Sequence, residues 1–309
     1  MECGCEANRY PNLFRVSGKG PPMARSRKMK RYPVQRMFSV GQASPAAANA
    51  VADVSRMLSE INHRLYRQSR YYEASVTIDA DAGPEGTTVD VYALTDTWWT
   101  QKSLQLAKTA WDMSNSEEMK MLNGRVARWN DFRVNHGLSL PGGTGTLDAI
   151  QFGSTLSSAR FIAGEFDFAE VVDQAGVTRT FTWANTPAAS EFSIMDEYDA
   201  SGNTDVDPTT PAIGPYTGLL PNLEAGAADA LQDNGNNPPY NATGYGNAIW
   251  VKVGTLHLGS GRQRLSTGFF TAPCGYIALA GIGTVPNAEV SIEVKGGDYK
   301  GVKAPSMLE

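Results

Sequence analysis

The residues most suited to chemistry in this 309-residue chain are basic side chains near its N-terminus. Residues 9–36 contain nine Lys or Arg residues and no Asp or Glu. Lysine and arginine neutralise phosphates and release their counterions, so this run is suited to binding a polyanion. The candidates for this role within residues 1–36 are Arg15, Lys19, Arg25, Arg27, Lys28, Lys30, Arg31 and Arg36.

The segment that carries most of these cations cannot form a core. Residues 18–36 contain three prolines, two glycines and few large apolar side chains, so we expect an extended or disordered arm. Such an arm offers no fixed register for reading bases, and its binding would be directed at the phosphate backbone and weakened by salt. A nuclear-localisation patch and a solubilising tail remain the alternatives.

The charge is distributed unevenly along the chain. Residues 1–70 carry 13 Lys or Arg against 4 Asp or Glu, whereas residues 71–309 carry 14 against 28. Between Arg179 and Lys252 there are nine acids and no Lys or Arg. This asymmetry predicts that the arm meets a polyanion and that the rest of the chain does not.

An acidic stretch offers oxygen ligands for a cation. Asp199, Asp205 and Asp207 lie close together, but their spacing does not fit an EF-hand. We therefore interpret residues 199–247, rich in Asn, Gly, Pro and Asp, as a long acidic surface loop. A structural calcium ion bound by the three aspartates remains the alternative, and no other cofactor is expected.

The chain shows no catalytic pattern. His63, His136 and His257 are far apart in sequence, and no Gly-x-Ser-x-Gly motif accompanies them. Cys3 and Cys5 have no second cysteine pair with which to bind zinc, so free thiols are expected. We therefore predict that the protein is not an enzyme.

Composition favours a soluble protein built mainly from strands. The chain has 31 glycines and 17 prolines, which favour turns, and only 19% charged residues. It has no apolar run of about 18 residues, which a membrane span requires. Its N-terminus lacks the apolar core of a secretory signal, and three cysteines cannot form a disulfide framework.

One helix is expected directly after the arm. Ser44 and Pro45 are typical of a helix start, and apolar residues then recur at helical spacing as far as Leu65. The opposite side of this helix of about 20 residues carries Arg56, Arg64 and Arg67, which would extend the basic surface of the arm. An ordinary amphipathic surface helix is the alternative interpretation.

The remaining elements are mostly strands. Alternating apolar residues from Tyr71 and again over 88–94 predict an antiparallel hairpin. Two short helices should follow it, one capped by Asp96 and one starting at Ser114, with tryptophans in the core or in subunit contacts. Further strands are predicted near 159–170, 177–184, 190–197, 248–258, 275–282 and 288–295.

These elements predict a mainly β fold in two parts. Residues 1–44 would form the arm, and residues 45–309 an eight-stranded antiparallel jelly-roll sandwich with a helical insertion after its second strand. The long loop over residues 199–247 would precede the last three strands.

This layout resembles that of capsid proteins of small icosahedral viruses with a single jelly roll, most closely those of circular single-stranded DNA viruses. The basic arm, the hairpin, the helical insertion and the late acidic loop carry the resemblance. Short segments add to it, namely Val34–Val40, residues 62–68 and the run Phe269-Phe-Thr-Ala-Pro-Cys-Gly-Tyr-Ile277. The arm departs from the pattern by having less arginine than many such proteins, and a cysteine-containing leader over residues 1–17 precedes it.

The resemblance implies a self-assembling shell protein located in the virion and, in an infected cell, in the nucleus. Its partners would be further copies of itself and the viral genome, bound without sequence specificity and expected to be single-stranded DNA, with no membrane partner. The receptor, the host and the subunit number are not implied. A non-viral nucleic-acid-binding β-sandwich, a carbohydrate-binding or structural β-sandwich and an unrecognised enzyme remain alternatives.

Overall fold

The chain divides into two units, residues 1–31 and residues 32–309. The computed structural model describes residues 33–42, 47–81, 87–121, 131–151, 166–173, 175–184, 187–202 and 249–308. All structural statements below concern these ranges. The seven arm cations from Arg15 to Arg31 therefore lie outside the described residues.

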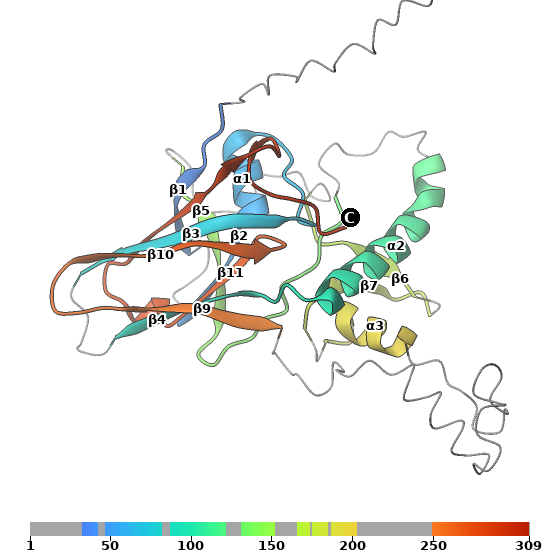
Figure 1. The fold of residues 1–309 in the computed structure, drawn as a ribbon. Coiled ribbons are helices and arrows are strands. Elements are labelled where there is room, and N and C mark those ends of the chain that lie inside the picture. The colour runs from blue at the N-terminus through green and yellow to red at the C-terminus, as the bar shows by residue number, and fades with distance from the viewer. Residues whose placement is uncertain are drawn as a thin grey trace, which may run out of the picture. The chain divides into compact units, whose positions relative to one another are not determined.

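The second unit is built on one large sheet of nine strands that nearly closes on itself (Figure 1). Every neighbouring pair is antiparallel except β2 and β5, which are parallel. The edge strands, β9 and β10, are consecutive in the chain. In spatial order the strands are β10 (Gln263–Pro273), β3 (Tyr71–Ala80), β12 (Glu289–Val294), β1 (Met37–Gln42), β5 (Thr144–Ala149), β2 (Asn49–Asp53), β11 (Tyr276–Ala280), β4 (Thr88–Leu94) and β9 (Trp250–His257).

Four of the strand pairs are nested in the sequence, and the outermost is β1 with β12. β2 pairs with β11, β3 with β10, and β4 with β9, all antiparallel. The predicted hairpin between β3 and β4 is therefore wrong, although both strands lie where expected. Alternation shows that a segment is a half-buried strand but does not identify its partner, and here distant segments supply the partners.

Side chains on the two faces of the sheet enter two separate cores. On β11, Ile277 and Leu279 join one buried cluster, whereas Tyr276 and Ala278 join the other. The first cluster also contains Val76 and most other buried residues of β3 and β4. Because both faces of β11 are covered, its sequence is almost continuously apolar.

The second core lies between the large sheet and α2, α3, β6, β7 and β8, whereas α1, the 3₁₀ turn and β14 contribute to the first core. Figure 1 shows α2, α3, β6 and β7 together on one side of the large sheet. No helix among the described residues is long and apolar enough to cross a membrane. The elements outside the large sheet have the following bounds. The helical ones are α1 (Val54–Asn62), α2 (Trp98–Met121), α3 (Ile194–Gly202) and the 3₁₀ turn Ile282–Thr284. The strands are β6 (Glu170–Val172), β7 (Thr178–Thr182) and β8 (Glu191–Ser193), which form a three-stranded sheet, and the pair β13 (Gly296–Gly297) and β14 (Gly301–Val302).

The long helix predicted from Ser44 is wrong in its first half. Residues 49–53 form β2, which lies between β5 and β11, and α1 starts only at Val54. Ala50, Val51 and Ala52 are all buried, so their pattern fits a helix or a doubly covered strand equally well. Pairing with two neighbouring strands decides in favour of the strand.

Other boundaries also differ from the predictions. β1 lies inside the range assigned to the arm, so at least residues 37–42 belong to the sheet. The helical insertion follows the fourth strand in chain order, and it is one continuous helix, α2, instead of two. Residues 194–202 are helical, so the predicted strand over 190–197 shrinks to β8, and the acidic loop does not start at 199. Residues 203–247 lie outside the described ranges.

Candidate nucleic-acid interface

Four of the predicted phosphate-binding residues lie in the described body. Arg36 is exposed and lies over Gly296. Arg56 lies on α1, and Arg64 and Arg67 lie in the loop that follows it. Arg56 differs from the other three, because two carboxylates already compensate its charge.

Arg56 interacts with two carboxylates that are almost fully buried. Its Nε lies 3.6 Å from Glu60 Oε1, and its Nη2 lies 3.8 Å from Asp148 Oδ2. A phosphate would have to compete with both carboxylates for this guanidinium. Arg56 is therefore a structural residue that joins α1 to β5.

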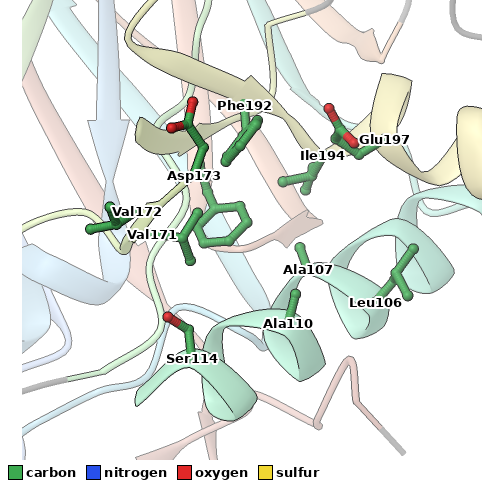
Figure 2. A pocket seen from close by; sticks show the side chains of 11 residues that line it. Leu106, Ala107, Ala110, Ser114, Val171, Val172, Asp173, Phe192, Ile194 and Glu197 are labelled. Carbon is green, nitrogen blue, oxygen red and sulfur yellow. The ribbon is translucent and has the colours of Figure 1, made fainter. Parts of the chain in front are cut away.

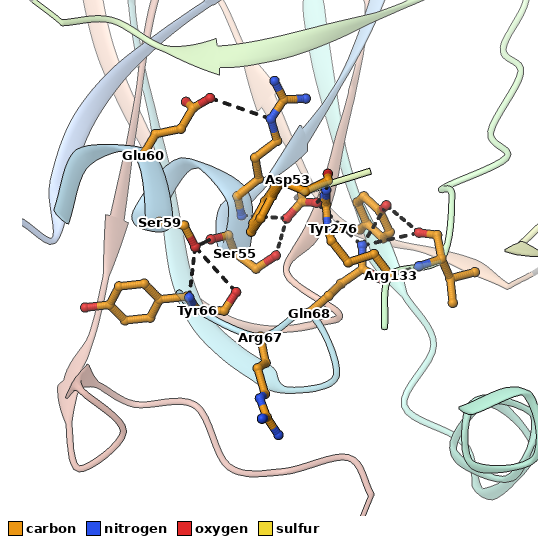
Figure 3. Close-up of polar contacts among 12 residues, drawn as sticks. Asp53, Ser55, Ser59, Glu60, Tyr66, Arg67, Gln68, Arg133 and Tyr276 are labelled. Atoms are coloured by element: carbon orange, nitrogen blue, oxygen red, sulfur yellow. Dashed lines mark hydrogen bonds and ion pairs between the residues drawn. The ribbon is translucent and has the colours of Figure 1, made fainter. Parts of the chain in front are cut away.

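The loop after α1 is held in place from its start. Asp53 caps the helix, since its Oδ1 accepts hydrogen bonds from Arg56 N at 3.0 Å and Ser55 Oγ at 2.6 Å. At the other end His63 adopts a left-handed conformation with φ of 47°, which turns the chain sharply. Tyr66 N then donates to Ser59 Oγ at 2.8 Å, so the loop folds back on the helix (Figure 3).

A buried polar network fixes the second half of this loop. Gln68 accepts a hydrogen bond from Val134 N at 2.7 Å and donates to the hydroxyl of Tyr276 at 2.8 Å. Next to it, Arg133 pairs with Asp53 and donates to Phe166 O, although its side chain is only 3% exposed. Figure 3 shows these groups converging from segments that are far apart in sequence. The loop backbone is therefore rigidly positioned.

Four cations lie close together at this loop. We call Arg64, Arg67, Arg70 and Lys300 the basic cluster. The Arg70 guanidinium lies 3.6 Å from the centre of the Tyr299 ring, and its Nη1 donates to Ala304 O at 2.8 Å. Lys300 has a φ of 49° and donates from Nζ to Leu65 O. The C-terminal segment thus brings a fourth cation to the loop.

The cluster has an excess of positive charge. Burial lowers the pKa of Lys300, and the charges of Arg67, Arg64 and Arg70 lower it further, whereas Asp131 raises it. Asp131 Oδ1 lies 3.7 Å from Arg67 Nε, and burial raises the pKa of Asp131 despite this neighbour. Among the groups that shift the pKa of Lys300, one carboxylate stands against three arginines, so an incoming anion would relieve the repulsion between these cations.

The chain of the arm joins the body close to the basic cluster. Gln35 N donates to Asn62 Oδ1 at 2.9 Å, and Asn62 Nδ2 donates to Gln35 O at 3.1 Å. Asn62 ends α1, and Arg64 follows two residues later. The first described residues therefore lie beside the start of the loop that carries Arg64 and Arg67.

The other candidate sites gain no support from the described residues. There, no group of three or more His, Cys, Asp or Glu side chains could hold a metal ion. Asp205, Asp207 and the side chain of Asp199 lie outside the described residues, as do Cys3 and Cys5. The His136 ring packs edge-on against Tyr276 at 6.0 Å, and burial lowers its pKa, so this histidine is a neutral structural residue.

Arg70 and Lys300 were not predicted as site residues. They lie 230 positions apart, and only the folded chain brings them together. The one available signal was Arg70, which follows Arg64 and Arg67 at spacings of three residues. Comparisons of the chain with models of protein families, with curated proteins and with solved structures found no match.

Proposed function

We propose that this protein is the capsid protein of a small icosahedral virus, which assembles into a shell and packages its genome through cations. The observation that carries the proposal is the basic cluster, which lies next to the point where the basic arm joins the body. Both groups of cations would then act on the same polyanion. This arrangement fits a protein with a charged inner surface.

The strand pairing supports a jelly-roll topology for the body. A jelly roll is a long antiparallel hairpin wound into two sheets, so its strand pairs are nested in the sequence. The pairs β2 with β11, β3 with β10 and β4 with β9 have this order. The pair β1 with β12 encloses these three as a fourth nested pair. Jelly rolls also occur in lectins and cupins, so the topology alone does not select the function.

The chemistry of the cluster supports binding without sequence specificity. Its guanidinium and ammonium groups recognise phosphates, and they lie on a loop and not on a helix or ribbon that could enter a groove. Phosphates are the same in DNA and RNA. The choice of single-stranded DNA as the genome therefore rests on the resemblance alone.

Size-exclusion chromatography with light scattering tests this proposal. The full chain should elute as closed particles in the megadalton range, with an absorbance ratio at 260 and 280 nm that indicates packaged nucleic acid. Removing residues 1–31 should lower this ratio, because the arm supplies most of the cations. Electron microscopy of the leading peak would show whether the particles are closed.

A species of one or two copies at every salt concentration, with or without added DNA, would refute the capsid proposal. If that species still bound DNA through the basic cluster, the protein would be a nucleic-acid-binding β-sandwich. If it bound neither DNA nor RNA, the proposed role of the cluster would fail as well.

A further inference from the structure

Two large apolar side chains of α2, which we call the apolar stripe, are left exposed by the described part of the chain. The side chains of Leu106 and Met113 are 41% and 71% exposed, respectively. They lie seven residues apart, which places them on the same side of the helix, with Lys102 one turn before them. Large exposed apolar side chains in a row are typical of an interaction surface.

An apolar groove runs beside this stripe. It has a volume of about 530 Å³ and is lined by Leu106, Ala107 and Ala110 of α2 and by residues of β6, β7, β8 and α3. Figure 2 shows Val171 and Phe192 facing α2 across the groove, with Asp173 and Glu197 nearby. The groove is large enough to accept side chains from another molecule.

The two halves of α2 carry opposite net charges, so the helix is complementary in charge to an antiparallel copy of itself. Its midpoint lies between Thr109 and Ala110, and Leu106 and Met113 are equally distant from that point. Residues 98–109 contain two lysines and no acid, a net charge of +2. Residues 110–121 contain three acids and one lysine, a net charge of −2. The helix dipole adds to this difference, with its positive end at Trp98.

We propose that α2 packs antiparallel against α2 of a second copy of this chain, across a two-fold axis near Thr109 and Ala110. Each Leu106 then meets the partner's Met113, and the flexible thioether enters the groove beside Leu106. Position 102, a lysine, then lies opposite position 117 of the other helix, a glutamate, whereas Lys108 and Asp112 already pair within one helix at 2.5 Å. The small side chains near the axis let the two helices approach closely.

The charges of this surface favour a second copy of the chain over an unrelated partner. In a two-fold contact each residue occurs twice, so a stripe with equal and opposite charges about its midpoint is complementary to itself. Parallel packing would instead bring like charges together. The contact rests on the proposed function only in that both require the chain to self-associate.

Cysteine cross-linking tests the geometry. In a chain carrying Cys3→Ser and Cys5→Ser, the double substitution Leu106→Cys and Met113→Cys should give a disulfide-linked dimer under mild oxidation. Within one helix these two positions lie about 10 Å apart, beyond the reach of a disulfide. Each single substitution is the matched control and should cross-link at least tenfold less. Equal cross-linking of single and double variants, or none, would overturn the proposal.

A second variant tests the energetic role of the stripe. Met113→Glu should weaken self-association at least tenfold in light scattering, because it places a charge in the apolar contact. Val177→Glu changes another exposed apolar residue, 43% exposed and outside the groove lining, and should leave self-association unchanged. Circular dichroism would establish that both variants remain folded.

The outcomes separate this contact from the capsid proposal. If Met113→Glu protein forms the same particles as the unchanged chain, the α2 contact is wrong and the capsid proposal stands. If the double cysteine variant cross-links but no larger particle forms under any condition, the α2 contact stands and the capsid proposal fails.

Discussion

Removing charge from the basic cluster should reduce the salt dependence of nucleic-acid binding. The variant carries Arg64→Gln, Arg67→Gln and Lys300→Gln. Arg70 is left unchanged because its guanidinium also holds Ala304 and Tyr299. Glutamine keeps much of each side chain's length and polarity, so the loop and its buried network should remain folded.

The expected change follows from counterion release. Each phosphate contact with a single strand contributes about 0.7 to the slope of log affinity against log salt. Three lost contacts lower the slope by about 2, and two contacts, if Asp131 already compensates Arg67, by about 1.4. Between about 50 and 200 mM salt, the unchanged chain should therefore lose roughly 7- to 20-fold more affinity than the variant.

Fluorescence anisotropy with a labelled single strand of mixed sequence measures both slopes. The matched control carries Arg179→Gln, Lys252→Gln and Arg262→Gln, which also removes three positive charges. Each of these residues is paired with an aspartate away from the cluster, at 2.8, 2.7 and 2.8 Å, respectively. If the cluster variant and the control changed the slope equally, net charge and not the cluster would explain binding, and the reasoning would be refuted.

Three further predictions concern the stability of the body. Gly275→Ala should lower the free energy of unfolding by about 2–4 kcal/mol in urea titrations, since φ is +73° and a Cβ would lie 3.1 Å from Ser55 N, whereas Gly176→Ala, with φ of +79° and open space around it, should cost about 1–2 kcal/mol. Arg133→Met should cost about 3–5 kcal/mol by leaving the half-buried carboxylate of Asp53 without its cationic partner, and a smaller loss by calorimetry would contradict that role. Hydrogen bonds from Lys295 and Lys303 lower the pKa of Glu73, so its contribution to stability should be present above its unfolded pKa and lost as pH falls through the folded value. Glu73→Gln should then destabilise the protein near neutral pH but match the unchanged chain in acid, and a constant difference would exclude this interpretation.

The sequence predicted five of the nine strands of the large sheet, and the one pairing that it predicted is wrong. Residues 71–80 and 88–94 alternate clearly, and both form strands, yet they pair with β10, β11, β12 and β9 instead of with each other. Alternation records which face of a strand is buried, and that information is local. Pairing depends on contacts across about 200 residues, which no local pattern encodes.

The sequence does not predict two strands in the interior of the sheet, β2 and β5. β2 and β5 lie in the interior of the sheet and contain Ala50, Ala52 and Gly145, small residues that are typical of helices or loops. Small side chains allow close packing on both faces, but they leave no two-residue period. The alanine-rich segment therefore predicts a helix, and the glycine-rich segment predicts a loop.

The basic cluster also depends on contacts between distant segments, and buried bonds between such segments hold its like charges together. Arg64, Arg67, Arg70 and Lys300 repel one another, and that repulsion opposes folding. The buried bonds of Gln68, Asp53 and Arg133 hold the loop in place against this repulsion. A polyanion that binds the cluster would remove the repulsion and thereby stabilise the folded body, by about 2.7 kcal/mol when its concentration is 100 times the dissociation constant. Under the capsid proposal, the genome would then stabilise the subunit in addition to being packaged by it.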